Sequence, residues 1–320
     1  MHQPPAPLQA SVLAVDAARR RAEDYFHAAQ SANTRRAYAS DWRHFESWCL
    51  AAGQGSLPAS PETVVLYLSA LADTTKVSTL TRRVSAISQA HQTAGFQTPT
   101  QHIAVRKLMA GIRRRKGSMQ TGKRPVLTHE LKMIVARLSP ERLLDVRDRA
   151  LLLLGFAGAF RRSELVSLDI QDLSWSQEGL VVTLRQSKTD PEGYGRKIGI
   201  PHGSTPSTCP VRAVKVWTEA LGADSGPLFR RIDRHERIGA RLTAQSVALV
   251  LKKRAAQAGL EPAQLAGHSL RAGLATAAAA AGVSERVIMA QTGHRSLPVL
   301  RRYIREGSLF LENAAARVGL

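Results

Sequence analysis

Residues 291–308 read QTGHRSLPVLRRYIREGS. The segment joins a Gly-His pair to a tyrosine, Tyr303, which follows His294 by nine residues and comes directly after two arginines. A tyrosine usually lies in a core or at an interface, because most of its ring is apolar. Two interpretations are open: a solvated basic helix that carries a tyrosine by chance, or a site in which the phenol reacts among cations. The remainder of the chain decides between them.

The composition points to a polyanionic partner. The chain has 320 residues, enough for two domains, and 44% of them are hydrophobic, as in ordinary globular proteins. Lys and Arg total 45 against 25 Asp and Glu, which gives a formal net charge of +20. A membrane surface could attract such a charge, but the basic residues are spread along the chain and are mostly arginine, which binds phosphate with a planar fork. Nucleic acid is therefore the favoured partner.

The sequence has no feature typical of export or membrane insertion. Cys49 and Cys209 lie far apart without metal-ligand spacing, which indicates buried thiols in a reducing compartment. The longest apolar run, residues 150–160, is too short to span a bilayer. The N-terminus lacks the ordered basic, apolar and cleavage regions of a secretory signal. We expect a cytoplasmic protein without membrane contact.

The first half of the chain predicts a small helical bundle after a proline-rich, disordered tail over residues 1–10. Asn33 or Thr34 is expected to cap one helix, which stops at Gly53, and Ser60 is expected to cap the next. Helices are predicted over residues 14–30, 31–53, 58–73, 77–96 and 100–117. One apolar stripe at helical spacing predicts core positions at Tyr38, Trp42, Phe45 and Cys49.

The second half predicts a helical domain with one β-hairpin. The hairpin pairs residues 179–189 with 195–201 across a Gly- and Pro-containing turn at 190–194. The segment 143–160 is apolar nearly all round, which indicates a buried helix. Further helices are predicted over residues 128–138, 209–221, 243–259, 268–282, 284–293, 296–307 and 308–320. The predicted domains are 11–117 and 129–320, joined by a linker of Gly, Ser, Pro and Lys over 118–128.

Cleavage of a DNA phosphodiester needs a nucleophile, positive charge on the nonbridging oxygens and a proton for the departing oxygen. Metal nucleases supply the charge with carboxylate-bound cations. The sequence has no Asp/Glu cluster with ligand-like spacing and no glycine-rich phosphate loop. An enzyme of this composition would have to use arginines, which donate paired hydrogen bonds to phosphate and stay protonated.

Five short segments carry the residue types that such a site needs. They contain Arg161 with Glu164, Lys188, His268 with Arg271, His294, and Tyr303. Each has an ordinary alternative: a surface ion pair, a solvated lysine, a core histidine or a helix-capping group. Their common order and spacing make the combination informative.

Arg-x-x-Glu, a hairpin lysine, His-x-x-Arg, Gly-His and a tyrosine nine residues on together resemble the catalytic domain of the tyrosine recombinase (phage integrase) family. The resemblance spans about residues 125–310, and ASPETVVLYLSAL with RKLMAGIRRRKG extends it to the first half. It implies a mainly α fold: an N-terminal helical core-binding (SAM-like) bundle and a C-terminal mixed α/β catalytic domain with a small antiparallel sheet. A simple two-domain recombinase without a separate arm-binding domain is implied.

The resemblance also implies how the bond is broken. Tyr303 resembles the nucleophile that attacks the scissile phosphate, forming a 3′-phosphotyrosyl link and freeing a 5′-hydroxyl. His268 would assist proton transfer from the tyrosine, and Lys188 would protonate the leaving 5′-oxygen. Because the phosphotyrosyl link stores the bond energy, neither ATP nor a metal cofactor is expected.

The remaining residues would hold the phosphate. Arg161 and Arg271 would clamp the nonbridging oxygens, His294 would donate a hydrogen bond to the phosphate, and Glu164 would orient its neighbours. Arg161, not the adjacent Arg162, is chosen by its register with Glu164. Many members have glycine where this chain has Ala159, a change expected to affect packing only. Some members carry tryptophan in place of His294.

The family's partners carry over as expectations. They are double-stranded DNA with an inverted-repeat site, two protomers per site and a homotetramer in the synapse. The helix over 308–320 would dock into a neighbouring protomer, although it could instead cover its own domain. Candidate DNA contacts are Arg113, Arg114, Arg115, Lys116, Gln245 and Lys252.

Two alternatives stay open from the sequence. A type IB topoisomerase uses the same cleavage chemistry, although the small helical first domain favours a recombinase. A catalytically silent helical DNA-binding protein could keep the fold, although the complete set of site residues argues against it.

Overall fold

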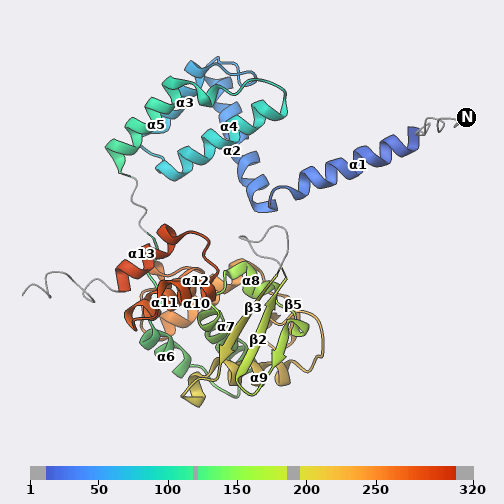
Figure 1. Ribbon diagram of the computed structural model, residues 1–320, viewed down its shortest axis with the longest axis vertical. Coiled ribbons are helices and arrows are strands. Elements are labelled where there is room, and N and C mark those ends of the chain that lie inside the picture. Colours follow the sequence, from blue (N-terminus) through green and yellow to red (C-terminus); the bar gives the residue numbers. More distant parts are fainter. Residues whose placement is uncertain (1–11, 118–121, 186–194, 308–320) are drawn as a thin grey trace, which may run out of the picture. The chain divides into compact units, whose positions relative to one another are not determined.

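The computed structural model describes residues 12–117, 122–185 and 195–307. The chain divides into two compact units, residues 1–121 and 122–320 (Figure 1). No helix among the described residues is long and apolar enough to cross a membrane.

The N-terminal unit is a helical bundle, as predicted. It contains α1 (Val12–Ala28), α2 (Ala32–Ala51), α3 (Pro61–Leu71), α4 (Val77–Thr93) and α5 (Ile103–Lys116), with a 3₁₀ turn, η1 (Pro99–Gln101), before α5. Helix α2 packs on α4 and α3 packs on α5. Side chains such as Phe45, Tyr67, Leu80 and Ile87 meet in a core and are fully buried.

Local capping residues start these helices. The Ser60 side chain accepts a hydrogen bond from the Thr63 N–H, and Pro61 occupies the first helical position, as the sequence predicts. The predicted cap of α2 is wrong by two to three positions: Ser31, not Asn33 or Thr34, is the N-cap, and it accepts from the Thr34 N–H. A serine just before several polar residues can cap as well as any of them, so the local pattern alone does not choose.

The apolar stripe of α2 is only partly a core stripe. Phe45 and Cys49 are buried, and Trp42 packs against them from a half-buried position. Tyr38, at the N-terminal end of the stripe, instead lines a polar groove between α2 and α4. The core prediction is therefore wrong for Tyr38, because the core does not extend to the first turns of α2.

The described part of the second unit is mainly helical with two small antiparallel sheets (Figure 1). Its helices are α6 (Thr128–Ala136), α7 (Leu143–Ala157), α8 (Arg162–Ser167), α9 (Pro210–Leu221), α10 (Ala244–Gln257), α11 (Ser269–Ala280), α12 (Glu285–Thr292) and α13 (Leu297–Gly307). Its strands are β1 (Leu173–Trp175), β2 (Gly179–Leu184), β3 (Arg196–Pro201), β4 (Arg230–Ile232) and β5 (Ile238–Arg241). Three short 3₁₀ turns, η2 (Ile170–Asp172), η3 (Pro206–Thr208) and η4 (Pro262–Gln264), join these elements.

The predicted hairpin is confirmed as β2 paired antiparallel with β3, and Val182 lies opposite Ile198. Alternate residues of both strands are buried against the helices, which fits the period of a one-faced sheet. Strand β1 and the β4–β5 pair were not predicted. These strands are three or four residues long, which is too short for an alternating pattern to be detected in the sequence.

Helix α7 lies at the centre of this unit, as its apolar sequence predicts. It packs against α9 and α11, and its apolar side chains join the main core. Three charged side chains of α7 are buried as well. Arg254 of α10 bonds Asp145 at 2.5 Å and Asp148 at 2.6 Å, so the charges are paired inside the core.

The segment before α6 belongs to the second unit. The Arg124 N–H donates to the Gln264 carbonyl and the Val126 N–H donates to the Ser269 carbonyl. Val126 is fully buried, and its carbonyl oxygen lies so close to Gly273 that a Cβ there would be 2.0 Å away. The boundary between the units, after Thr121, lies within the predicted linker over 118–128, and the last residues of that segment contact η4 and α11.

Candidate active site

Four segments of the second unit bring their polar side chains together. Arg161 precedes α8, His268 and Arg271 open α11, His294 follows α12, and Tyr303 lies on α13. The Tyr303 hydroxyl is 2.8 Å from His268 Nε2, and its ring centroid is 5.8 Å from that of His294. The sequence-predicted residues that are described therefore form one cluster. Lys188 lies outside the described residues.

Arg161 is held by Glu164. The Glu164 carboxylate accepts from the Arg161 backbone N–H at 2.8 Å and from Arg161 Nη1 at 2.5 Å. Glu164 is only 3% exposed, so this is not the surface pair of the ordinary alternative. Arg162 is exposed to solvent, which agrees with the choice of Arg161 by register.

A tight turn between α7 and α8 places Arg161 in the cluster. Gly158 is the C-cap of α7, and Ala159 after it has a left-handed backbone with φ of +47°. A Cβ at Gly158 would lie 2.1 Å from the Phe160 ring, so this glycine is needed for close packing. The expectation that Ala159 in place of glycine affects packing only is wrong, because Ala159 occupies a conformation that favours glycine.

Arg271 is the most deeply buried cation of the cluster, at 1% exposure. Its Nη1 donates to the Ala159 carbonyl at 2.8 Å, while Nε and Nη2 are buried and have no hydrogen-bond partner among the described residues. Burial, and then the neighbouring charge of Arg161, lowers the pKa of Arg271 to about 10. A buried guanidinium with unused donors beside a second arginine is a site for an anion.

Hydrogen bonds set the tautomer of His294. Thr292 Oγ1 donates to the Ile288 carbonyl at 2.6 Å and lies 2.7 Å from His294 Nδ1. Because the hydroxyl proton is used on the carbonyl, Nδ1 must donate to Oγ1, which directs Nε2 away from Thr292. Burial, and then the charge of Arg271, lowers the pKa of His294 to about 3, so its neutral form is favoured.

Tyr303 and His268 form a donor–acceptor pair. The His268 side chain reaches solvent, but desolvation by the groups around its ring, and then the charge of Arg271, lowers its pKa. This favours a neutral ring that can accept a proton at Nε2. The Tyr303 hydroxyl can then donate across the 2.8 Å contact. The apolar side of Tyr303 packs on a small cluster that includes Ala275, Ile288 and Leu300. The Tyr303 ring thus packs on apolar side chains, and its hydroxyl is hydrogen-bonded to His268.

Two site-adjacent residues were missed by sequence reasoning. Arg196, at the start of β3, donates from Nη1 to the carbonyls of Ala290 and Gln291 at 2.9 and 3.1 Å. Gln291 Nε2 donates to the Ala157 carbonyl at 2.9 Å. No sequence signal indicates either role, because each side chain contacts backbone groups far away in the chain.

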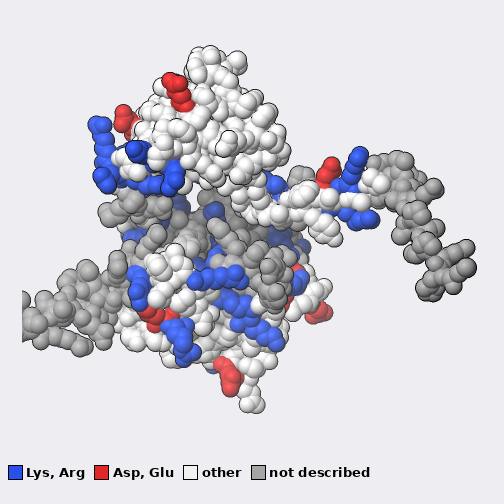
Figure 2. Space-filling model, turned by 45° about the horizontal axis from the view of Figure 1, so that its top comes forward, with Lys and Arg blue, Asp and Glu red and all other residues white. Residues whose placement is uncertain are grey.

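The predicted DNA contacts are distributed over both units. Arg113, Arg114 and Arg115 are exposed at the end of α5, Gln245 is exposed at the start of α10, and Lys252 is half-buried. Lys116 Nζ donates to the carbonyls of Ala72, Asp73 and Thr75, so its donors are already used in the N-terminal unit. Figure 2 shows Lys and Arg side chains gathered on the visible surface, with Asp and Glu more scattered.

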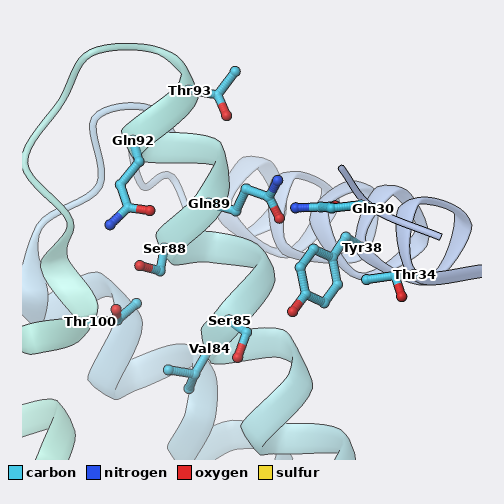
Figure 3. Close-up of a pocket in the computed structure, with 10 residues that line it drawn as sticks. All are labelled: Gln30, Thr34, Tyr38, Val84, Ser85, Ser88, Gln89, Gln92, Thr93 and Thr100. Carbon is cyan, nitrogen blue, oxygen red and sulfur yellow. The ribbon is translucent and has the colours of Figure 1, made fainter. Parts of the chain in front are cut away.

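A groove of about 700 Å³ lies in the N-terminal unit. Figure 3 shows hydroxyl and amide side chains of α2 and α4 facing this hollow, among them Thr34, Tyr38, Ser85 and Gln89. None of the described residues that line it is Lys, Arg, His, Asp or Glu, so they offer no charged side chain to a phosphate. Among the described residues, no group of three or more His, Cys, Asp or Glu side chains could hold a metal ion.

A helical domain that gathers arginines and histidines around a single tyrosine has the architecture of a tyrosine-type DNA recombinase. The chain belongs to the phage integrase family, whose model matches residues 125–308, and the family's N-terminal SAM-like domain matches residues 23–95. Members of this family are site-specific recombinases that cut and rejoin DNA, and this chain is an enzyme of that kind.

The chain is similar to named recombinases over most of its length. An integrase/recombinase xerD homolog of Selenomonas ruminantium is 44% identical over 290 residues, covering 89% of this chain and 85% of the relative. The recombinase cre of Escherichia phage P1 is 24% identical, with coverage of 91% and 89%.

Solved structures share the fold. A XerH site-specific recombinase bound to its palindromic difH substrate matches with a TM-score of 0.59 and 16% identity, over 80% of this chain and 70% of that chain. A lambda integrase dimer bound to a COC′ core site matches with a TM-score of 0.57 and 17% identity, over 90% and 76%.

Proposed function

We propose that this recombinase cleaves each DNA strand with Tyr303 and stores the broken bond as a 3′-phosphotyrosyl link. The observation that carries the proposal is the 2.8 Å contact of the Tyr303 hydroxyl with His268 Nε2, beside a buried arginine that has unused donors. A nucleophile, its base and an anion site are thereby adjacent.

The chemical step balances with the residues of this chain. The Tyr303 proton passes to His268 Nε2 as the phenolic oxygen forms its bond to phosphorus. The bond from phosphorus to the 5′-oxygen breaks, its electron pair moves to that oxygen, and Lys188 supplies the proton that makes the 5′-hydroxyl. Rejoining reverses these transfers, with a 5′-hydroxyl as the attacking group.

The arginines act on the developing charge. Arg161, oriented by Glu164, and Arg271, oriented by the Ala159 carbonyl, are proposed to bind the nonbridging oxygens. His294 completes the phosphate site. Burial is the first cause of the low pKa of His294, and the charges of Arg271 and Arg161 add to it. A bound phosphate offsets those charges, so it favours a proton on Nε2 that can be donated to the phosphate. Neither a metal nor ATP has a role in this scheme.

The proposed partner is double-stranded DNA with an inverted-repeat site, bound by two protomers and synapsed by four. The DNA-bound structures named above, one on a palindromic site and one a dimer on a core site, support this partner by their likeness in fold. Arg113, Arg114 and Arg115 are proposed as backbone contacts. Gln245 and Lys252 are weaker candidates, and Lys116 would have to leave its carbonyl partners. A DNA substrate also supports a cytoplasmic location.

The proposed docking of residues 308–320 into a neighbouring protomer lies outside the described residues. A chain ending at residue 307 tests it. We expect this shortened chain to form an adduct as a dimer on one site and to lose the four-protomer synapse in sedimentation. Retained synapsis would overturn the docking.

The decisive experiment traps the covalent intermediate. The wild-type protein first selects its inverted repeat from a random-sequence duplex library, and that repeat is rebuilt as a nicked suicide duplex. We expect a DNA adduct on a denaturing gel with wild type and with Tyr25→Phe, whose tyrosine is 74% exposed on α1, and none with Tyr303→Phe. An adduct with Tyr303→Phe, or none with wild type, contradicts the proposal.

A relaxation assay, together with the adduct assay, separates the two alternatives. A type IB topoisomerase would relax supercoiled DNA that lacks the selected repeat, whereas the proposed recombinase requires it. A silent DNA-binding protein would select a sequence but form no adduct.

A further inference from the structure

Arg196 joins the sheet to the helix that precedes His294. It is the first residue of β3, and its Nη1 donates to the carbonyls of Ala290 and Gln291, at 2.9 and 3.1 Å, near the end of α12. The last carbonyls of a helix have no partner within the helix, and the helix dipole makes them negative. A guanidinium at this end both satisfies and stabilises them.

The glycine before His294 permits this contact. Gly293 has φ of +66° and ends α12 in a left-handed conformation. A Cβ at Gly293 would lie 2.7 Å from Arg196 Nη1 and 2.8 Å from its Cζ. The turn that starts the His294 segment therefore packs directly on the Arg196 guanidinium, and its position depends on that of the arginine.

A second side chain, that of Gln291, connects the end of α12 to α7. Gln291 Nε2 donates to the Ala157 carbonyl of α7 at 2.9 Å and lies 3.4 Å from the Gly199 carbonyl of β3. Helix α7 leads within four residues to Arg161. The end of α12 is thus held between β3 and α7. His294 follows this helix end, and α7 leads to Arg161.

The charge of Arg196 is costly in this place. Its Nη2 is buried and has no hydrogen-bond partner among the described residues, and its guanidinium lies in a region that also holds Arg161 and Arg271. Burial, with repulsion by Arg161, lowers the pKa of Arg196. An apolar residue would join the strand to the turn without that cost, so the two carbonyl bonds are what the arginine contributes.

We propose that Arg196 is a positioning residue of the recombinase: it holds the end of α12 on β3 and thereby sets the distance of His294 from the phosphate bound by Arg161 and Arg271. The proposal rests on the phosphate site described under Proposed function. It assigns Arg196 no contact with DNA. Its effect on cleavage must therefore pass through His294.

The test compares Arg196→Met with Lys197→Met. Lys197 is the next residue of β3, is exposed, and supplies a matched loss of one positive charge. Both variants are measured for binding to the selected duplex and for the rate of adduct formation on its suicide form. We expect both to bind within about threefold of wild type. Arg196→Met is expected to form adduct about 100-fold more slowly, since a displacement near 1 Å is enough for such a loss.

A double-mutant cycle with His294→Asn gives the readout that a merely structural role would not produce. If Arg196 acts through His294, Arg196→Met costs less than about threefold in the His294→Asn background. Equal rates for Arg196→Met and Lys197→Met overturn the proposal, and so does a full 100-fold loss in both backgrounds.

Arg196→Lys keeps the test decisive if Arg196→Met does not fold. A lysine retains the charge but reaches one carbonyl, so we expect a loss of about tenfold that disappears in the His294→Asn background. A tenfold loss that persists there contradicts the proposal. The wild-type and Tyr303→Phe arms report on the proposed function separately, because neither depends on residue 196.

Discussion

At the scale of single residues, the backbone carbonyl of Ala159 orients Arg271 by accepting a hydrogen bond from it. The left-handed conformation of Ala159, with φ of +47°, turns this carbonyl toward Arg271 Nη1. A residue with a Cβ in this conformation costs about 1–2 kcal/mol, and such strain persists where neighbouring structure over-determines it. The strain here serves the orientation of Arg271.

Substitution of Ala159 tests this account. Ala159→Gly removes the clash of the left-handed conformation but gives the unfolded chain more freedom. We expect adduct formation to stay within about threefold and the free energy of unfolding to rise by no more than about 1 kcal/mol. Ala159→Val places a β-branched side chain in the same conformation and is expected to lower the free energy of unfolding by about 2 kcal/mol or more. Urea denaturation and the suicide duplex give both numbers. A Val variant as stable as the Gly variant would show that the turn is unstrained.

The depressed pKa of His294 predicts a pH dependence of stability. Its pKa is about 3 in the folded protein against an ordinary value of 6.5, so the unfolded chain binds more protons between those values. The free energy of unfolding should therefore fall as pH is lowered below 6.5, by about 1 kcal/mol per pH unit for this group. Denaturant unfolding of wild type and His294→Asn from pH 7.5 to 5 measures it. Parallel curves for the two proteins would contradict the prediction.

At the scale of elements, two glycines inside helices have opposite roles. Gly273 of α11 faces the Val126 carbonyl, which a Cβ would approach to 2.0 Å, whereas a Cβ at Gly111 of α5 would meet nothing within 4 Å. Helix α11 carries His268 and Arg271 at its start. The close packing at Gly273 therefore supports the site as well as the fold.

Alanine substitution at both positions separates packing from helix propensity. Gly111→Ala should stabilise its unit by about 0.5–1 kcal/mol, because alanine restricts the unfolded chain and favours a helix. Gly273→Ala should destabilise by about 2 kcal/mol or more and slow adduct formation, because the Val126 backbone cannot move away freely. Thermal unfolding of each variant is the measurement. A stabilising effect of Gly273→Ala would mean that the segment before α6 does not dock on α11.

At the scale of the whole molecule, the charge of +20 is a property of both units. It predicts strongly salt-dependent DNA binding, because each neutralised phosphate releases counterions. The exposed Arg113, Arg114 and Arg115 have no carboxylate partner among the described residues, whereas Arg185 pairs with Asp169 and Asp172.

Replacing Arg113, Arg114 and Arg115 with alanine should weaken binding to all duplexes alike. The slope of log K against log salt is expected to become shallower by about 2–3, because each phosphate that an arginine neutralises adds about 0.9 to its magnitude. Arg185→Ala should leave the slope nearly unchanged. Fluorescence anisotropy between 50 and 200 mM salt gives both slopes. An unchanged slope in the triple variant would place the DNA path elsewhere.

Local sequence features account for much of what could be predicted. Ser60 with Pro61, the glycine stop at Gly293 and the alternating strands β2 and β3 act within a few residues, so their patterns are readable in one chain. The residue types of the proposed active site were readable through their resemblance to one family, in which arginine, histidine and tyrosine follow in that order. The predictions were wrong at the α2 cap, where several capping residues lie close together in the sequence. They missed β1, which is only three residues long.

By itself the sequence determined the helical bundle, the hairpin, the polyanionic partner and which side chains could carry a phosphate reaction. Only the tertiary structure decided that Ala159 is strained, that Tyr38 lines a groove, that His294 is held neutral, and that Arg196 supports its turn. The physical reason is distance. Caps and strand alternation depend on neighbours in the chain, whereas a pKa, a close approach or a side-chain bond to a remote carbonyl depends on segments that only folding brings together.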